Sequence, residues 1–298
     1  DISLEATGQA RIDAGLSGVV EATDGAAISG LMATNLILAD VQNRLTNTTM
    51  TAGGSVTVAS TQNAGINATN TASATAEGAA VGLTLAFNVL GVAAQNLLSL
   101  GKDALLGGSL GNVDTNTTLT RLERSAIKAG GNVAITAQAG FGEQSGIASL
   151  IDGAAASDGG AGVGLILAGN RVEADTLALV IGGNVDTTDA IPPADLALQA
   201  EDRASIDSTV QLTAGGGVAV GAVLARNDIH SAVMAKAQDA TLTLSGDATL
   251  TAKQNQRINA LLTGSITASA ESSGASGIAA RAAAASRRVS SIQSFRQT

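Results

Sequence analysis

The chain of 298 residues contains no cysteine, tryptophan or tyrosine, and it has only three phenylalanines and two prolines. The lack of cysteine excludes disulfides, thiolate nucleophiles and thiolate metal sites. Because aromatics are so few, Ala, Val, Leu and Ile carry the apolar content of 45%, and we expect many small side chains packed in thin, regular layers. The scarcity of proline leaves the backbone donors available for a continuous ladder of strands.

Charge is also sparse, at 14% of residues, and the net charge is -9. Nucleic acids and anionic membranes bind basic patches, so neither is expected as the main partner. Residues 1–30 show no basic segment followed by an apolar stretch, and the sequence therefore predicts no signal peptide there. Residues 79–100 are long enough to cross a bilayer, but glycines, asparagines and a glutamine interrupt them, so we predict no membrane insertion.

One pattern recurs five times along the chain, which is typical of repeat folds. Each unit opens with a short segment that has apolar residues at alternate positions, as a β-strand does. The opening segments are residues 2–6, 56–60, 133–137, 196–200 and 248–252. The period-2 alternation and the richness in strand formers disfavour helical repeats.

Two polar columns accompany the repeat. Four units carry a triplet that begins ten residues after the start of the opening segment and places an Asx residue between an isoleucine and a small residue; the Asx residues are Asp13, Asn67, Asp207 and Asn259. The third unit carries this triplet late, at residues 147–149, which predicts a small insertion before it. An Ala- and Gly-rich strand then ends in an asparagine in four units: Asn35, Asn88, Asn170 and Asn227.

These repeats predict an all-β fold, a right-handed parallel β-solenoid, because parallel crossovers take that hand. The units span approximately residues 1–55, 56–132, 133–195, 196–247 and 248–298, and we expect them to form one segment of a much larger protein. The opening segments lie 54, 77, 63 and 52 residues apart. A coil of three strands of about five residues needs roughly 24 residues, so we expect each unit to supply about two coils.

Two stretches depart from the pattern. Residues 92–111 contain six leucines, of which Leu97, Leu98, Leu100, Leu105 and Leu106 suit either a short amphipathic helix or an extra coil, and the sequence does not decide between them. Residues 182–195 hold both prolines and predict a loop that projects from the coil.

The strand at residues 56–59, the triplet at 66–68, the Ala- and Gly-rich run at 79–88 and the turn at 129–133 resemble the repeats of very large secreted bacterial proteins. These are the filamentous-haemagglutinin-like adhesins and the leukotoxin-type, autotransporter or two-partner-secreted passengers of Gram-negative bacteria. The resemblance covers most of the chain. It implies a β-solenoid displayed outside the cell, in adhesion or in a biofilm matrix, and it implies no particular ligand.

Few residues offer chemistry. His230 is the only histidine and has no second histidine or cysteine with which to form a usual metal site. The column Asp13, Asn67, Asp207, Asn259 admits two interpretations: a cation-binding stripe with side chains about 10 Å apart, or, as we favour, local capping of backbone groups. We interpret the column Asn35, Asn88, Asn170, Asn227 as corner asparagines that hydrogen-bond turn backbone.

We therefore expect a structural or adhesive scaffold with no enzymatic activity, cofactor or metal, located outside the cell or on the bacterial surface. Its expected partners are a host-cell, glycan or matrix surface, or like subunits. One alternative is a self-assembling filament or sheath subunit, which would use exposed strand edges. Another is a polysaccharide-active β-helix enzyme, which the three phenylalanines serve poorly because sugar sites stack rings on aromatics.

Overall fold

A computed structural model describes residues 1–91, 115–268 and, for the backbone alone, 278–296, and every regular element in these ranges is a β-strand. The strands form three sheets, which we call A, B and C. Sheet A holds β1 (Ile2–Ala22), β5 (Val56–Ala76), β9 (Val133–Ala139), β10 (Gly146–Ser157), β13 (Leu196–Asp202), β14 (Ser205–Gly216), β17 (Ala248–Gln254) and β18 (Arg257–Ala268). Sheet B holds β2 (Ala26–Ile37), β3 (Val41–Thr46), β6 (Ala79–Leu90), β7 (Asn116–Glu123), β11 (Ala161–Ile181), β15 (Val218–Gln238) and β19 (Ile278–Arg296). Sheet C holds β4 (Thr49–Ala52), β8 (Ala126–Ala129), β12 (Asn184–Asp186) and β16 (Thr241–Thr243).

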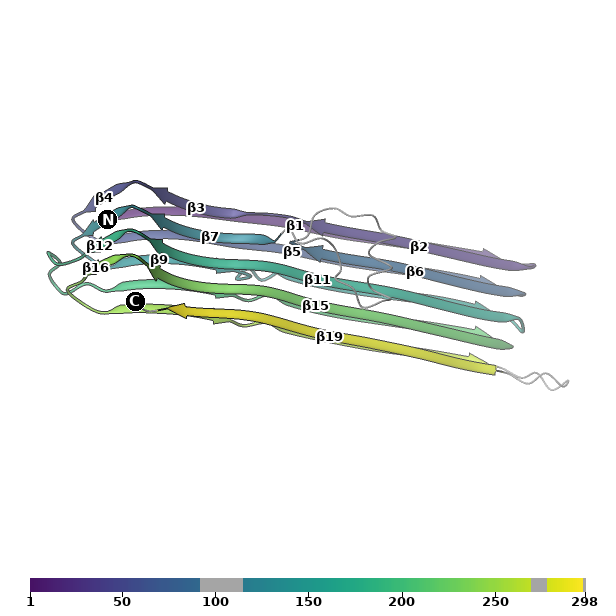
Figure 1. Ribbon diagram of the computed structural model, residues 1–298. Helices are drawn as coiled ribbons and strands as arrows, with labels where there is room; N and C mark the ends of the chain where they lie inside the picture. Colours follow the sequence, from purple (N-terminus) through teal and green to yellow (C-terminus); the bar gives the residue numbers. More distant parts are fainter. Residues whose placement is uncertain (92–114, 269–277, 297–298) are drawn as a thin grey trace.

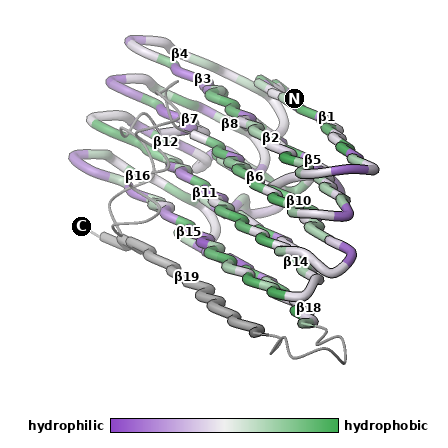
Figure 2. Tube along the Cα trace, turned by 90° about the vertical axis from the view of Figure 1, so that its right-hand side faces the viewer, coloured by the Kyte–Doolittle hydropathy of each residue, from purple (hydrophilic) through white to green (hydrophobic). Residues whose placement is uncertain are grey.

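The described strand pairs are parallel, and each of the first four repeats forms one coil that runs through sheets A, B and C in turn, while the described strands of the fifth lie in sheets A and B. The five opening segments lie in one column, in which Ile2 pairs with Val56, Val56 with Val133, Val133 with Leu196, and Leu196 with Ala248. The predicted all-β fold of stacked parallel strands is thus confirmed. Figure 2 shows the coils lying one on another.

The expectation of two coils per repeat is wrong, because each repeat pairs directly with the next one. The estimate assumed strands of about five residues, whereas β1, β5, β11 and β15 each have 21 residues. The asparagines within these strands suggest corners in the sequence, since asparagine and glycine favour turns. In the structure they are strand positions, and one coil consumes the whole repeat.

The coil is long and flat rather than triangular (Figure 1). Sheets A and B face one another along their length. Sheet C closes one end, and short turns such as residues 77–78 and 158–160 close the other, which we call the tight-turn end. A strand of 21 residues extends about 70 Å at about 3.3 Å per residue, whereas five coils at about 4.8 Å stack to about 24 Å. The longest dimension of the described segment therefore follows the strands.

The core between sheets A and B changes along the strands. Near sheet C it contains larger aliphatic side chains, such as Val58, Ile135 and Leu198, each with none of its surface exposed. At the tight-turn end the buried cluster consists of alanines alone: Ala27, Ala74, Ala76, Ala80 and Ala155. The predicted core of small side chains is therefore also tapered, with the two sheets approaching most closely where only methyl groups separate them.

The insertions fall in different places. Ala139 pairs with Gln62 while Gly146 pairs with Gly65, so residues 140–145 contain the extra residues that delay the third triplet, as predicted. The predicted loop at 182–195 is partly wrong, because residues 184–186 form β12 of sheet C; the part that projects is 187–195, where Ile191 is 93% exposed. Residues 92–111, predicted as a helix or an extra coil, lie outside the described residues.

Candidate functional site

The four asparagines of the second column form a hydrogen-bonded ladder along the stack. The Nδ2 of Asn35 donates to Oδ1 of Asn88 at 2.8 Å, Asn88 donates to Asn170 at 2.9 Å, and Asn170 donates to Asn227 at 2.7 Å. Parallel in-register strands place identical side chains about 4.8 Å apart, which lets each amide bridge to the next one. The side chains therefore join four successive coils in addition to the backbone ladder.

The ladder lies inside the molecule. Asn88, Asn170 and Asn227 are at most 1% exposed, and they point from sheet B toward sheet A. The second amide hydrogen of Asn170 crosses the interior to Ser208 Oγ at 3.1 Å. The interpretation of these residues as corner asparagines bonded to turn backbone is wrong, because they occupy mid-strand positions and bond mainly to one another.

A second buried polar cluster was not predicted. Ser60 and Gln62 follow Val56 and Val58 at inward positions of β5, and they meet Thr118 and Thr120 of β7 across the interior. Thr118 Oγ1 and Gln62 Oε1 are 2.8 Å apart, and Thr120 Oγ1 and Ser60 Oγ are 2.9 Å apart. The sequence signal was the interruption of the apolar alternation by Ser and Gln at positions where an inward side chain was expected.

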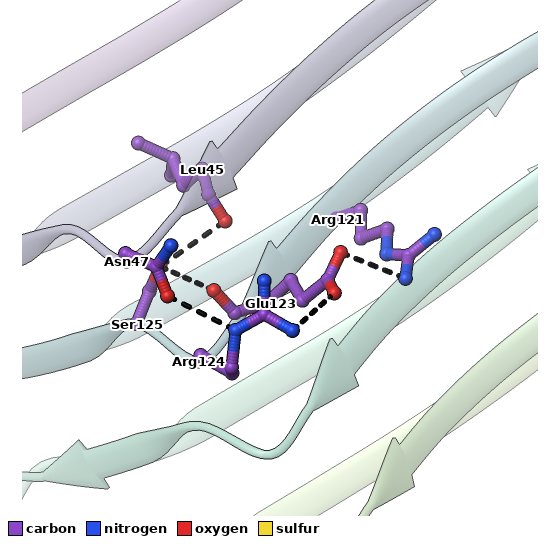
Figure 3. Close-up of polar contacts among 6 residues, drawn as sticks. All are labelled: Leu45, Asn47, Arg121, Glu123, Arg124 and Ser125. Atoms are coloured by element: carbon purple, nitrogen blue, oxygen red, sulfur yellow. Dashed lines mark hydrogen bonds and ion pairs between the residues drawn. The ribbon is translucent and has the colours of Figure 1, made fainter.

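A true corner lies between sheets B and C. Asn47, Arg124 and Asp239 have φ values of 52°, 47° and 50°, and Gly182 at the same place in the third coil has 57°. Figure 3 shows the contacts of this corner. Arg124 Nε donates a hydrogen bond to Asn47 Oδ1 at 3.0 Å, and the Glu123 carboxylate forms ion pairs with Arg121 at 2.8 Å and Arg124 at 3.0 Å. Asn, Asp and Gly tolerate this left-handed conformation best, so three of the four coils carry a residue type that suits the corner, and Arg124 is the exception.

The Asx column lies on the outer face of sheet A. Asp13 pairs with Asn67, Asn67 with Ala148, Ala148 with Asp207, and Asp207 with Asn259. Because each repeat is one coil, these positions are about 4.8 Å apart, not the expected 10 Å. Both carboxylates are paired, Asp13 with Arg11 and Asp207 with Arg257 at 2.6 Å. The described residues contain no cluster of three or more His, Cys, Asp or Glu side chains that could hold a metal ion.

A polar cleft adjoins this column. The loop at residues 140–145 stands on sheet A and bounds two hollows of about 260 and 430 Å³, both lined by Arg11, Glu143, Gln144 and Ser145. Asn67, Asp207 and Arg257 line the smaller hollow. The loop is held in place by Gly142 N, which donates to Asn63 Oδ1 at 2.8 Å, and by Phe141, whose ring lies 3.9 Å from the Arg203 guanidinium. The cleft combines cations, carboxylates and amides, and so it offers hydrogen bonds to a polar ligand.

The outer face of sheet B carries two ion pairs that sequence reasoning missed. Arg171 pairs with Glu173 on β11, and Arg226 pairs with Asp228 at 2.6 Å on β15, with all four side chains at most 7% exposed. The signal was the Arg-x-acid spacing beside the ladder asparagines, because residues two apart on a strand share a face. His230 lies on this face as well, in register with Glu173.

Asp202 is a buried carboxylate at the end of β13, with 1% of its surface exposed. Ser231 Oγ donates to its Oδ2 at 2.5 Å, and the backbone N–H groups of Arg203 and Ala204 also donate to it. Burial raises the pKa of Asp202 although these hydrogen bonds act in the opposite direction.

We predict that the stability difference between the native chain and Asp202→Asn changes with pH. A carboxyl group whose pKa is raised in the folded state favours folding most when it is protonated. Relative to the variant, the native chain should therefore lose stability as the pH rises from below about 4, the unfolded pKa, through the raised folded pKa. Chemical denaturation of both proteins across this pH range measures the difference.

Asp13→Asn is the matched control, since the hydrogen bond from Arg11 lowers the pKa of Asp13. The sign is reversed there: the native chain should gain stability relative to Asp13→Asn as the pH rises through the lowered folded pKa toward the unfolded value. Equal pH slopes for the two variants would contradict both assignments.

Within the described residues no helix has the length and hydropathy needed to cross a membrane, and residues 79–90 of the interrupted apolar stretch form strand β6. No protein-family model matches the chain, and neither a curated protein nor a solved structure does so.

Proposed function

We propose that the chain is a segment of a non-catalytic extracellular scaffold of the adhesin type, built as a right-handed β-solenoid. The observation that carries this proposal is the unbroken register: the coils pair along sheets A and B, and buried amides connect four of them through Asn35, Asn88, Asn170 and Asn227. Such a stack extends by adding coils and keeps its cross-section, which suits a rigid spacer that displays surfaces.

The resemblance of the repeats to filamentous-haemagglutinin-like adhesins supports the same proposal, with a bacterial surface or the extracellular space as location. A host-cell, glycan or matrix surface is the proposed partner. On this chain the polar cleft beside residues 140–145 is the proposed contact, because insertions on a solenoid commonly carry its specific contacts.

Solution scattering tests the proposed shape. A slab about 70–75 Å long, about 25 Å high and about 20 Å thick has a radius of gyration of about 23 Å. A compact globular chain of the same length has about 19 Å. We expect the larger value for the native chain, and a value near 19 Å would overturn the scaffold.

Glycan binding tests the proposed activity. Acidic and neutral glycans, offered with and without calcium, should be bound without being cleaved. Gln144→Ala in the cleft should weaken binding roughly twofold to tenfold, the value of one hydrogen bond, whereas Gln211→Ala, which is exposed on β14 of the same sheet, should leave it unchanged. Release of cleaved products would replace the scaffold with a polysaccharide-active enzyme.

A further inference from the structure

The outer face of sheet B is uncharged over its half nearest the tight-turn end. Residues 26–32, 79–85, 161–167 and 218–224 are in register in β2, β6, β11 and β15, and they contain no Asp, Glu, Lys, Arg or His. Figure 2 shows hydrophobic colouring along β6 and β11 in this region. We call the outward side chains of these four segments the apolar face.

The apolar face is open to solvent. Ile28 is 70% exposed, Met32 56% and Leu165 44%, and Leu83, Val218 and Val220 are also exposed. Ile28 and Met32 lie on β2 at the edge of sheet B, but Leu83, Leu165, Val218 and Val220 lie on strands with neighbours on both sides and are still exposed. Leu167, at the end of the face farthest from the tight turns, is only 7% exposed and packs against Phe87. The outer face of sheet A differs, because β5 presents mainly Thr, Ser and Asn outward there, for example Asn67, Thr69 and Thr75.

We propose that the apolar face binds the same face of a second copy of this chain, so that the two B sheets pack against each other. Like surfaces pair through a two-fold axis, and two twisted sheets stack about 10 Å apart with interdigitating side chains. One outward column runs Gly30, Leu83, Leu165 and Ala222 down the stack and continues on β19 at Ala282. A two-fold axis that runs parallel to the strands between Leu83 and Leu165 reverses this column, so that Leu83 lies beside Leu165 of the partner subunit.

The area of the face sets the strength of the contact. Four strands about 4.8 Å apart and seven residues of about 3.3 Å each cover roughly 440 Å², or roughly 880 Å² for a pair. A specific stable interface buries about 1,200 Å² or more, so this contact is a weak, concentration-dependent one. A patch of this size is nevertheless among the largest that a monomer exposes.

The net charge of the chain makes the proposed association depend on salt concentration. Each copy carries -9 overall, but the apolar face carries none of it, so copies repel one another at long range and attract at contact. Salt screens the repulsion over a Debye length of about 10 Å at 0.1 M. Association should therefore strengthen as sodium chloride rises, whereas a contact between opposite charges would weaken. This inference goes beyond the proposed function, because a scaffold can act as a single copy.

Sedimentation equilibrium of the 298-residue chain, over a wide range of concentration, tests the proposal. The native chain should show a monomer–dimer equilibrium, and Leu165→Lys should raise the dissociation constant roughly tenfold or more, because it buries two lysines per dimer. The matched control is Leu150→Lys on β10, in the same coil, 40% exposed on the outer face of sheet A, and it should leave the constant unchanged.

A second measurement does not depend on a charged variant. Since the chain has no cysteine, Leu83→Cys provides one site for a spin label, and its labels should be closely spaced between copies, unlike those on Leu150→Cys. A native chain that stays monomeric, or an equal loss of dimer in Leu150→Lys, would overturn the proposal. So would a monomer that floats with phosphatidylcholine vesicles and loses this binding in Leu165→Lys, which would assign the face to lipid. The two proposals are tested separately. If Leu165→Lys is monomeric and keeps the scattering profile of the slab, the proposed scaffold is supported, whether or not the native chain forms a dimer.

Discussion

Replacing Asn170 with alanine should lower the free energy of unfolding by about 3–4 kcal/mol, the largest effect that we expect from a single substitution here. The variant removes the acceptor of the Asn88 amide and the donor to Asn227 Oδ1, and both of these groups are at most 1% exposed. Each buried polar group left without a partner costs about 1–3 kcal/mol. Ser208 is less affected, since it keeps its contact with Ser149 Oγ at 3.1 Å.

Denaturant unfolding of the native chain, Asn170→Ala and the control Asn259→Ala measures this effect. Asn259 belongs to the exposed Asx column and should change stability by no more than about 0.5 kcal/mol. Asn170→Asp provides a further test, because it preserves the shape while removing both donors and adding a charge that the interior disfavours. Equal losses for Asn170→Ala and Asn259→Ala would mean that the ladder contributes no more than a surface amide.

The comparison of the ladder with the Asx column shows what a repeat can and cannot reveal. Both columns were found in the sequence by the same alignment, and both consist of Asn or Asp at a constant offset. The ladder lies on the inner face of sheet B, and the Asx column lies on the outer face of sheet A. The offset determines which residues share a column. Whether a column points inward depends on its lying an even number of residues from the inward positions of the same strand. This could not be counted in the sequence, because the strands are longer than predicted.

The register and the parallel pairing could be predicted because period-2 alternation and equal offsets depend on local sequence alone. The size of the coil could not be predicted. Gly and Asn are turn formers in most contexts, so the sequence predicts a strand end at Asn170 and gives no sign that Gly164 and Asn170 lie within one long strand. Their strand conformation is imposed by the opposite sheet: Leu212 occupies the space beside Gly164, and Asn88 and Asn227 flank Asn170.

The buried charges were unpredictable for a related reason. Arg171, Glu173 and Asp202 look in the sequence like ordinary polar positions of strands. Their burial, and the direction of the Asp202 pKa shift, depend on neighbours that are distant in the sequence, such as Ser231 on the opposite sheet. The exposed apolar face is the opposite case. Its residues read as core in the sequence, and the fold places one half of them outside.

Gly162→Ala should destabilise the chain by about 1–3 kcal/mol, although the repeat itself suggests that alanine belongs there. The same column holds Ala27, Ala80 and Ala219, so an alignment of the repeats would propose alanine as a stabilising consensus substitution. A Cβ at Gly162 would lie no more than 3.0 Å from the carbonyl oxygens of Gly215 and Ala155. Both are backbone atoms of sheet A, so neither can move aside as a side-chain end could.

Gly15→Ala is the matched control, because Gly15 lies within β1 on the outer face of sheet A and a Cβ there meets nothing within 4 Å. It should stabilise the chain by about 0.5 kcal/mol, since glycine in a strand loses more conformational freedom on folding than alanine does. Thermal and denaturant unfolding of the two variants should thus shift in opposite directions. If Gly162→Ala behaved like Gly15→Ala, the sheets at the tight-turn end would have room for another methyl group, and the tapered interior would not be the reason for glycine in this column.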